Sequence, residues 1–405
     1  MTLRKWGVIG LGFAMSVAGS GPASAQSDQA QRVQLELSGR TWNAAVCAHG
    51  NPAGTARCFA HVVTDARGNI MNGKPIANAG TPAGYGPADL VAAYSVPAGT
   101  GTPTVAIIDA YGYTNAEQDL GVYRAQYGLP PCTTANGCFK KVDQNGGTSY
   151  PRDDTGWSQE SALDMDMVSS ACPNCKIVLV EAKTSSFTNL IAAVTYAKTI
   201  PGVRAISNSY GGTDSSSLAQ YDSSYSANNI AITASTGDSG YGAQFPATSP
   251  GVVAVGGTSL TKGGSGYSES AWNGAGSGCG LGHAKPSWQT GVTDACAGRM
   301  EADISSVADP NTGVAVYGPA SRHGSSWMVF GGTSASAPFV GALFALRNGS
   351  INGASSIYSH TGNLHDVTTG SNGSSCPVNY YCHAGPGYDG PTGLGTPNGT
   401  AAFSN

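Results

Sequence analysis

Ser334 is the residue whose surroundings most favour nucleophilic chemistry. It lies in FGGTSASAPFVGALFAL, residues 330–346, between small residues and directly before an apolar segment of helical pattern. A serine hydroxyl attacks a carbonyl carbon only when a neighbouring base takes its proton and donors stabilise the oxyanion that forms. The rest of the sequence must therefore supply a base and an oxyanion donor.

Two acids in GWSQESALDMDMVSSACP, residues 156–173, are the leading candidates for the base. The pattern predicts a helix, on which Glu160 and Asp164 stand four residues apart and share one face. Two such carboxyls repel each other unless they share a proton. A solvated helix face would also explain this spacing. If the pair is buried, Glu160 can accept the serine proton while Asp164 holds it in place.

Asp238 is the candidate oxyanion donor. It follows an expected strand in IAITASTGDSGYG, residues 230–242, and is flanked by glycine. An aspartate in such a turn often only caps its own backbone. If it is protonated, however, its carboxyl can donate a hydrogen bond to an oxyanion.

Histidine is the usual base of a serine hydrolase, and the chain has seven. None lies in a helical segment whose small neighbours would allow close approach to Ser334. Asp109, in AIIDAYG at an expected strand end, looks like the first acid of a subtilisin, so a Ser/His/Asp triad stays open as an alternative. The missing histidine helix counts against it.

Short apolar, β-branched runs alternate with helical stretches from Thr104 onward. Runs that are apolar on both faces predict an α/β fold with a parallel sheet covered by helices on both sides. In such sheets the chemistry gathers beyond the carboxyl ends of the strands. The expected strands are TVAIIDA, KIVLVEA, VRAISNS, IAITAST and GVVAVGG, and the expected helices span about 115–127, 157–170, 187–199, 215–228 and 334–347.

Five motifs in this order, QESALD, ISNSYGG, STGDSG, GGTSASAP and GPGYDGPTGLGTP, resemble the sedolisin family of serine-carboxyl peptidases. The resemblance runs from about Gly84 to the C-terminus. It implies a subtilisin-like, mainly parallel sheet and the cleavage of peptide bonds in acid. It also implies that Ser334 is the nucleophile, Glu160 the general base, Asp164 its supporting acid and Asp238 the oxyanion donor.

The same resemblance implies a substrate-binding edge and a metal site. Ser209, Tyr210 and Gly211 would offer backbone groups to an extended peptide, as in strand addition, although an ordinary turn would also fit the motif. One structural Ca²⁺ ion is implied, with hard oxygen ligands from carboxylates and carbonyls; taken alone, both stretches read as plain turns. The implied ligands are Asp366, Val367, Gly385, Gly387 and Asp389.

Residues 1–25 are predicted to be a secretory signal peptide, with Arg4 and Lys5 ahead of an apolar stretch. Residues 26–82 would be a short pro-segment and linker, and residues 83–405 the catalytic domain with its C-terminal calcium loops. No later stretch has the roughly 18 uninterrupted apolar residues of a membrane span. We therefore expect a secreted monomer that makes no membrane contact after signal removal.

Low charge and paired cysteines characterise the exported part. Only 11% of the 405 residues are charged, the formal net charge is −4, and no Lys/Arg run is present, so a nucleic-acid partner is not expected. The CPNC at 172–175 could be a redox motif or half a zinc site, but a second CxxC is absent, and export favours a structural disulfide. The ten cysteines form neighbouring couples that predict five bridges: Cys47–Cys58, Cys132–Cys138, Cys172–Cys175, Cys279–Cys296 and Cys376–Cys382.

Together these features predict a secreted, acid-active endopeptidase that acts on proteins or peptides. A tripeptidyl exopeptidase of the same family and an exported binding protein without turnover are the alternatives. Two departures from the family pattern stand out. The family's pro-domain is much larger than residues 26–82, and His283 occupies a glycine-rich loop where a small polar residue is expected, which bears on substrate access.

Overall fold

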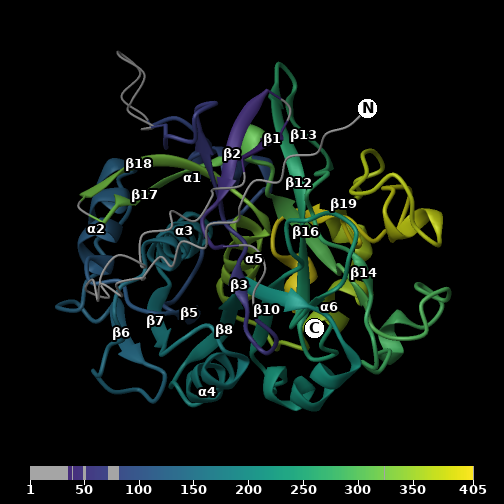
Figure 1. Ribbon diagram of the computed structural model, residues 1–405, viewed down its shortest axis with the longest axis horizontal. Coiled ribbons are helices and arrows are strands. Elements are labelled where there is room, and N and C mark those ends of the chain that lie inside the picture. Colours follow the sequence, from purple (N-terminus) through teal and green to yellow (C-terminus); the bar gives the residue numbers. More distant parts are fainter. Residues whose placement is uncertain (1–34, 39, 49–51, 72–81, 323, 405) are drawn as a thin grey trace, which may run out of the picture. The chain divides into compact units, whose positions relative to one another are not determined.

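The computed structural model describes residues 35–38, 40–48, 52–71, 82–322 and 324–404 (Figure 1). The predicted signal peptide and parts of the predicted pro-segment lie outside these residues. No helix of the described part is both long and apolar enough to cross a bilayer. The α-helices are α1 (Pro87–Ala93), α2 (Ala116–Gln126), α3 (Thr155–Ala171), α4 (Phe187–Ala197), α5 (Thr333–Arg347) and α6 (Ala354–Ser359).

The central sheet has the strand order β13-β12-β10-β8-β5-β7-β6, and β16 pairs with β12. All its pairings are parallel except that of β12 with β13, which confirms the predicted mainly parallel α/β architecture. The five expected strands are all present in it. The bounds are β5 (Thr104–Ala110), β6 (Phe139–Asp143), β7 (Lys176–Ala182), β8 (Val203–Asn208), β10 (Ala231–Ser235), β12 (Val253–Gly263), β13 (Gly266–Ala271) and β16 (Ile304–Val307).

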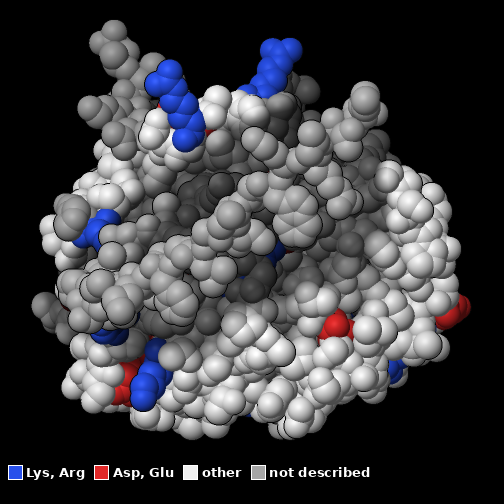
Figure 2. Space-filling model, viewed as in Figure 1, with Lys and Arg blue, Asp and Glu red and all other residues white. Residues whose placement is uncertain are grey.

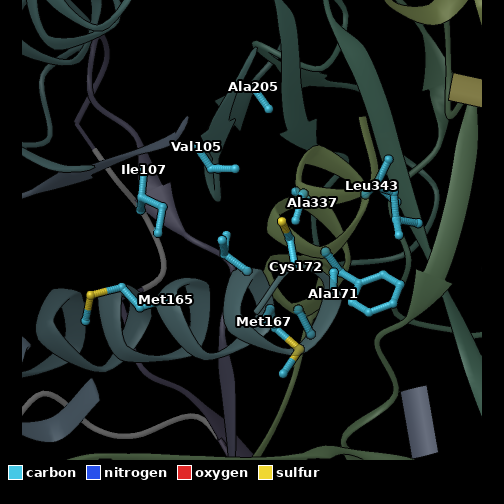
Figure 3. Packing of buried hydrophobic residues seen from close by; sticks show 14 of the residues in the cluster. Val105, Ile107, Met165, Met167, Ala171, Cys172, Ala205, Ala337 and Leu343 are labelled. Atoms are coloured by element: carbon cyan, nitrogen blue, oxygen red, sulfur yellow. The ribbon is translucent and has the colours of Figure 1, made fainter. Parts of the chain in front are cut away.

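Helices bury both faces of this sheet because successive strand side chains point to opposite sides. Val105 and Ile107 of β5 join the apolar core that contains α3 and α5 (Figure 3), whereas Ala106 and Ile108 join the core that contains α4. Helices α3 and α5 also pack against each other. The two helices that carry the predicted catalytic residues therefore share one face of the sheet.

The N-terminal strands pair with strands from much later in the chain. β2 (Thr41–Ala45) pairs with β1 (Leu35–Ser38) and β4 (His61–Thr64), and β4 pairs with β18 (Gly324–Gly331), which runs beside β17 (Val314–Ser321). A separate three-stranded sheet has the order β11 (Gln244–Phe245), β9 (Tyr210–Thr213) and β3 (Arg57–Cys58). Two small two-stranded sheets are β14 (Gly278–Cys279) with β15 (Met300–Glu301), and β19 (Leu364–His365) with β20 (Thr396–Pro397).

All five predicted disulfides are present, including Cys172–Cys175, so the CPNC motif is neither a free redox couple nor a zinc site. One expected helix differs: residues 215–228 contain the 3₁₀ helix Ser216–Tyr225 instead of an α-helix. Its sequence, SSLAQYDSSY, contains four Ser and one Asp, whose side chains compete with the backbone for hydrogen bonds. The face shown in Figure 2 carries few charged side chains, in keeping with the low charge content.

Candidate active site

Ser334 lies in the first turn of α5 and is fully buried. Its Oγ donates to the carbonyl oxygen of Ser209 at 3.3 Å. The residue that precedes the helix, Gly332, has φ 97°, a left-handed conformation that favours glycine. The chain thus turns sharply from β18 into α5 and places the hydroxyl at a helix N-terminus, where the backbone N–H groups favour negative charge.

Glu160 and Asp164 lie on one face of α3, and both are completely buried, which excludes the alternative of a solvated pair. The backbone N–H of Ala60 donates to Glu160 Oε2 at 2.9 Å, and Ser209 Oγ donates to Asp164 Oδ1 at 2.7 Å. The side chains of Ser334 and Asp164 are neighbours of Glu160, and Glu160 Oε1 and Asp164 Oδ2 are buried without a hydrogen-bond partner among the described residues. The packing of α3 on α5 therefore brings the serine and the two acids together in one buried cluster.

Burial raises the pKa of Glu160 well above its usual range, and the negative charges of Asp109 and Asp238 raise it further. The hydrogen bonds from Ser334 and Ala60 oppose this shift. For Asp164, burial again has the largest effect, and the charges of Asp109 and Glu160 add to it. Neighbouring buried carboxyls of this kind cannot all ionise at once, so they hold a proton in common.

Asp109 belongs to the same cluster, a role that the sequence analysis missed. It is the last residue but one of β5, is fully buried and accepts a hydrogen bond from Ser161 Oγ at 2.7 Å. Burial raises its pKa to about 7; the Ser161 bond opposes this and the charge of Glu181 adds to it. In the sequence, the position of Asp109 near the end of an expected strand was the feature that could have indicated this role. Its contacts link it to carboxyls and a serine, so they do not support the Ser/His/Asp alternative.

Asp238 follows β10 and faces the start of α5. Its Oδ1 accepts hydrogen bonds from Thr333 N at 2.8 Å and from Thr333 Oγ1 at 2.7 Å. Burial raises its pKa to about 7, although the Thr333 bonds and the positive charge of Arg57 act against this. A Cβ atom on Gly332 would lie 2.5 Å from Asp238 Oδ2, so glycine is needed there for the carboxyl to approach. In acid this carboxyl keeps its proton and can donate it in a hydrogen bond.

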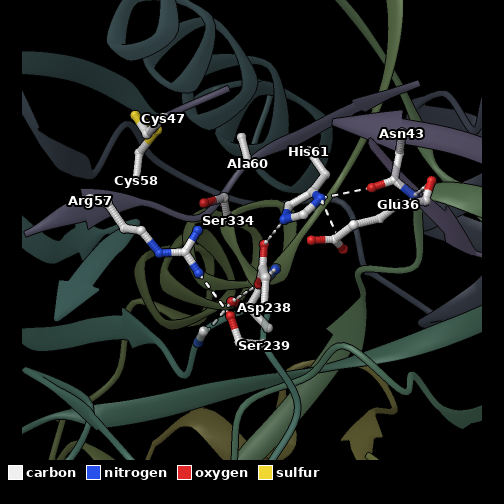
Figure 4. A network of polar contacts seen from close by, with 12 residues as sticks. Glu36, Asn43, Cys47, Arg57, Cys58, Ala60, His61, Asp238, Ser239 and Ser334 are labelled. Atoms are coloured by element: carbon white, nitrogen blue, oxygen red, sulfur yellow. Dashed lines mark hydrogen bonds and ion pairs between the residues drawn. A yellow bond between two sulfur atoms is a disulfide. The ribbon is translucent and has the colours of Figure 1, made fainter. Parts of the chain in front are cut away.

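His61 is a second residue that the sequence analysis did not connect with the site. It opens β4 and is fully buried, with Nε2 3.6 Å from Asp238 Oδ2 and Nδ1 2.7 Å from Asn43 Oδ1 (Figure 4). The short run HVVT, with two valines and a threonine, was a signal for a buried strand. Nothing local, however, indicates that this strand lies across the active site.

Tyr210 and Gly211, predicted to bind substrate with Ser209, lie on β9, between β3 and β11.

His283 lies between two acids of neighbouring loops: its Nε2 is 2.9 Å from Asp214 and its Nδ1 is 2.8 Å from Asp222. Burial lowers its pKa, but the two aspartates outweigh this and raise the pKa to about 9. A charged His283 therefore ties these loops together.

The predicted calcium ligands come together in the C-terminal loops. Gly387 N donates to Asp366 Oδ2 at 2.9 Å, and Gly385 N donates to Asp389 Oδ2 at 3.1 Å, so one loop bridges both acids. Asp389 is buried, and Val367 is buried next to Asp366. Two converging carboxylates and a glycine-rich backbone form a hard-oxygen donor set that fits Ca²⁺.

The fold and the site define a subtilisin-like α/β protein with a buried serine and a carboxyl cluster at the carboxyl edge of the sheet. The sequence pattern of the Subtilase family matches residues 140–356. Sedolisin of Pseudomonas sp. (strain 101) is 28% identical over 365 residues, and kumamolisin of Bacillus sp. (strain MN-32) is 31% identical over 362 residues; each alignment covers 78% of this chain. The structure of Pseudomonas sedolisin complexed with two molecules of pseudo-iodotyrostatin superposes with a TM-score of 0.65 and 27% identity, covering 78% of this chain and 95% of that one.

The chain therefore belongs to the sedolisin family within the subtilases. Its alignments span 60% of the length of sedolisin and 63% of that of kumamolisin.

Proposed function

We propose that this protein is a secreted serine-carboxyl endopeptidase that cleaves proteins or peptides in acid. The observation that carries the proposal is the buried cluster of Ser334, Glu160 and Asp164, with Asp238 facing the start of the helix that carries Ser334. No structural role requires three carboxyls to be buried beside a serine hydroxyl, since unpaired buried acids are costly. Catalysis by proton transfer explains the arrangement.

The nucleophilic step follows from these contacts. Ser334 Oγ attacks the substrate carbonyl carbon while its proton passes to Glu160, and Asp164 would support Glu160 by sharing a proton with it. The nitrogen of the cleaved bond then takes that proton from Glu160 and leaves. Water, deprotonated by Glu160, releases the acyl group from Ser334 in the second half of the reaction.

Asp238 stabilises the oxyanion in both halves. Its Oδ1 is fixed by Thr333, so a protonated Oδ2 can donate to the developing negative charge. This role requires a neutral Asp238, whereas Glu160 must be ionised to act as a base. Burial raises the pKa of Asp238 to about 7, so Asp238 stays neutral on the acid side of neutrality. The Glu160/Asp164 pair, which shares one proton, would still hold one negative charge there and so supply the base.

We further propose that Asp366 and Asp389, with carbonyl groups of Val367, Gly385 and Gly387, hold one Ca²⁺ ion. When bound, the ion would neutralise the two carboxylates and stabilise the C-terminal loops. These residues are remote in sequence from Ser334 and Glu160, so the ion would have a structural function.

The test is the hydrolysis of denatured proteins and of end-blocked peptides at pH 3 to 5 by the wild type and by Ser334→Ala. We expect the wild type to cut both and Ser334→Ala to cut neither, with an unchanged near-UV circular dichroism spectrum. Release of tripeptides from free N-termini, without cleavage of blocked peptides, would indicate the exopeptidase instead. Full turnover by a folded Ser334→Ala would refute the nucleophile, and an inactive wild type would favour a binding protein.

A further inference from the structure

A segment of the chain's own N-terminal part lies across the proposed active site. We call residues 55–64, which contain β3 and β4, the strap. Arg57 pairs with Gly211 and Cys58 with Tyr210 in an antiparallel ladder, and Phe59 N donates to the carbonyl oxygen of Ser209 at 3.2 Å. The same carbonyl accepts from Ser334 Oγ. The strap therefore occupies the edge predicted to bind an extended substrate.

The peptide bond between Phe59 and Ala60 lies between the groups that would act on a substrate. On one side, Ala60 N donates to the proposed base, Glu160. On the other, a Cβ atom on Gly332 would lie 1.9 Å from the carbonyl oxygen of Phe59 and 2.5 Å from Asp238 Oδ2, so this carbonyl points into the space beside the oxyanion donor. A scissile bond needs this orientation, with its oxygen toward the oxyanion donor and its nitrogen toward the base.

The Phe59 side chain fills a pocket whose floor is made of glycine. The ring is fully buried, and a Cβ atom on Gly211 would lie 2.8 Å from its Cε2 and Cζ atoms. A Cβ on Gly237, on the Asp238 turn, would lie 3.6 Å from Cζ. The guanidinium of Arg57 lies 5.1 Å from the ring centre. Bare backbone at Gly211 thus makes room for a flat aromatic side chain.

Both sides of this bond are anchored. The disulfide to Cys47 holds Cys58, and Val46 N donates to the carbonyl oxygen of Ala60 at 3.0 Å. His61, the next residue, pairs with Gly331 of β18 and lies beside Asp238. In Figure 4, Ser334 appears beneath Ala60, between Arg57 and His61. An incoming peptide must therefore displace the strap before it can reach Ser334.

We propose that the strap occupies the cleft as a built-in substrate mimic, with Phe59 in the primary specificity pocket, so that the enzyme cuts after aromatic residues and is restrained by its own chain. This inference rests on the proposed peptidase function. A substrate binds only to molecules in which the strap has moved away. Its apparent affinity is therefore the intrinsic affinity multiplied by the fraction of molecules in that open state. Loosening the strap should raise the affinity without any change in the catalytic groups.

The first experiment compares Phe59→Ala with the wild type on two blocked peptides at pH 4, identical except for Phe or Asp before the cleaved bond. We expect kcat/KM for the Phe peptide to rise about tenfold in Phe59→Ala, and the Phe peptide to be preferred by both proteins. Tyr150→Ala, which truncates an exposed aromatic side chain outside the strap, should leave the rate unchanged. If Phe59→Ala does not fold, the double variant Cys47→Ala/Cys58→Ala replaces it, with the same expected increase.

A second measurement separates the strap from the catalytic proposal. Calorimetry of the Phe peptide with Ser334→Ala and with Ser334→Ala/Phe59→Ala needs no turnover, and we expect binding about tenfold tighter to the double variant. Hydrolysis that Phe59→Ala fails to increase, or equal binding to the two proteins, would overturn the strap while leaving the peptidase intact. A preference for the Asp peptide would overturn the assigned pocket. If no variant cuts any peptide, the proposed function fails, and tighter binding to the double variant still supports the strap.

Discussion

The Glu160/Asp164 pair and the Asp303/Arg299 pair are two of the groups in the described part of this protein that contain buried acids, and the charges of these two groups are balanced differently. Among the described residues, neither Glu160 nor Asp164 forms an ion pair with Lys or Arg, and burial raises the pKa of both. Asp303, just before β16, is equally buried, but its Oδ2 lies 2.5 Å from Nη2 of the buried Arg299. There too burial raises the carboxyl pKa, yet the positive charge of Arg299 opposes it.

This difference separates the acids that we propose to be catalytic from an acid with a structural role. A carboxylate that is paired with a fixed cation stays ionised and serves as one half of a contact. Carboxyls that face only one another share protons, and a shared proton can be moved during a reaction. The comparison predicts that mutations in the first group damage activity and spare stability, while mutations in the second do the reverse.

The largest effect is expected for Glu160→Gln. Loss of the base should lower kcat by about 10² to 10⁴-fold, because the amide cannot accept the Ser334 proton. The free energy of unfolding should not fall, because the substitution removes one ionisable group from a cluster of buried acids that repel one another. The pKa of Glu160 is higher in the folded state than in the unfolded state. Its contribution to wild-type stability is therefore complete below the unfolded-state pKa and is lost as pH rises through the folded-state pKa. Glu160→Gln should therefore lose less stability than the wild type between pH 4 and 7, as measured by urea unfolding. A variant that is strongly destabilised at pH 4 would contradict a proton-sharing cluster.

Asp303→Asn should show the opposite pattern. It leaves the buried guanidinium of Arg299 without its carboxylate, which costs about 3–5 kcal/mol of unfolding free energy. Lys262→Ala is the control, because it breaks an ion pair with Asp89 that is largely exposed to solvent and is worth at most about 1 kcal/mol. Denaturant unfolding of both variants measures this difference, and equal losses would show that burial of the Arg299 pair has no special importance.

The sequence predicted the fold and the acids better than it predicted what surrounds them. Five of the eight strands of the central sheet and helices α3 and α5 follow from local periodicity. The spacing of Glu160 and Asp164 places both on one helix face. Asp109 and His61 could not be assigned in this way. They reach the site through strand pairing across long sequence separations, which no local pattern encodes. The predicted helix at 215–228 failed for a local reason, because its serines compete for the backbone hydrogen bonds.

Asp238→Asn tests the acid that must stay protonated. Activity of the wild type should fall as pH rises through about 7, where Asp238 ionises. Asparagine donates at every pH, so the variant should lose this alkaline limb, at a cost of about 10²-fold in rate if the amide is misplaced. Arg57, Glu36 and His61 also face Asp238, so His61→Gln is the control: it should keep a limb that belongs to Asp238. Loss of the limb in His61→Gln alone would assign it to the histidine.

The smallest effect is expected at a third group of acids, Asp366 and Asp389, which also lack a cationic partner among the described side chains. They are far in sequence from any proposed nucleophile, so by the same comparison a bound cation should balance them. A ligand held only by the folded state adds RT ln(1 + [L]/Kd) to stability, about 2.7 kcal/mol at a hundredfold excess over Kd. Exhaustive chelation should therefore lower Tm by a few degrees, and added Ca²⁺ should restore it. Asp366→Asn should show a lower Tm that chelation changes little. If elemental analysis finds no calcium and chelation leaves the wild-type Tm unchanged, these two acids are bound by the loop backbone alone, and the calcium site is refuted.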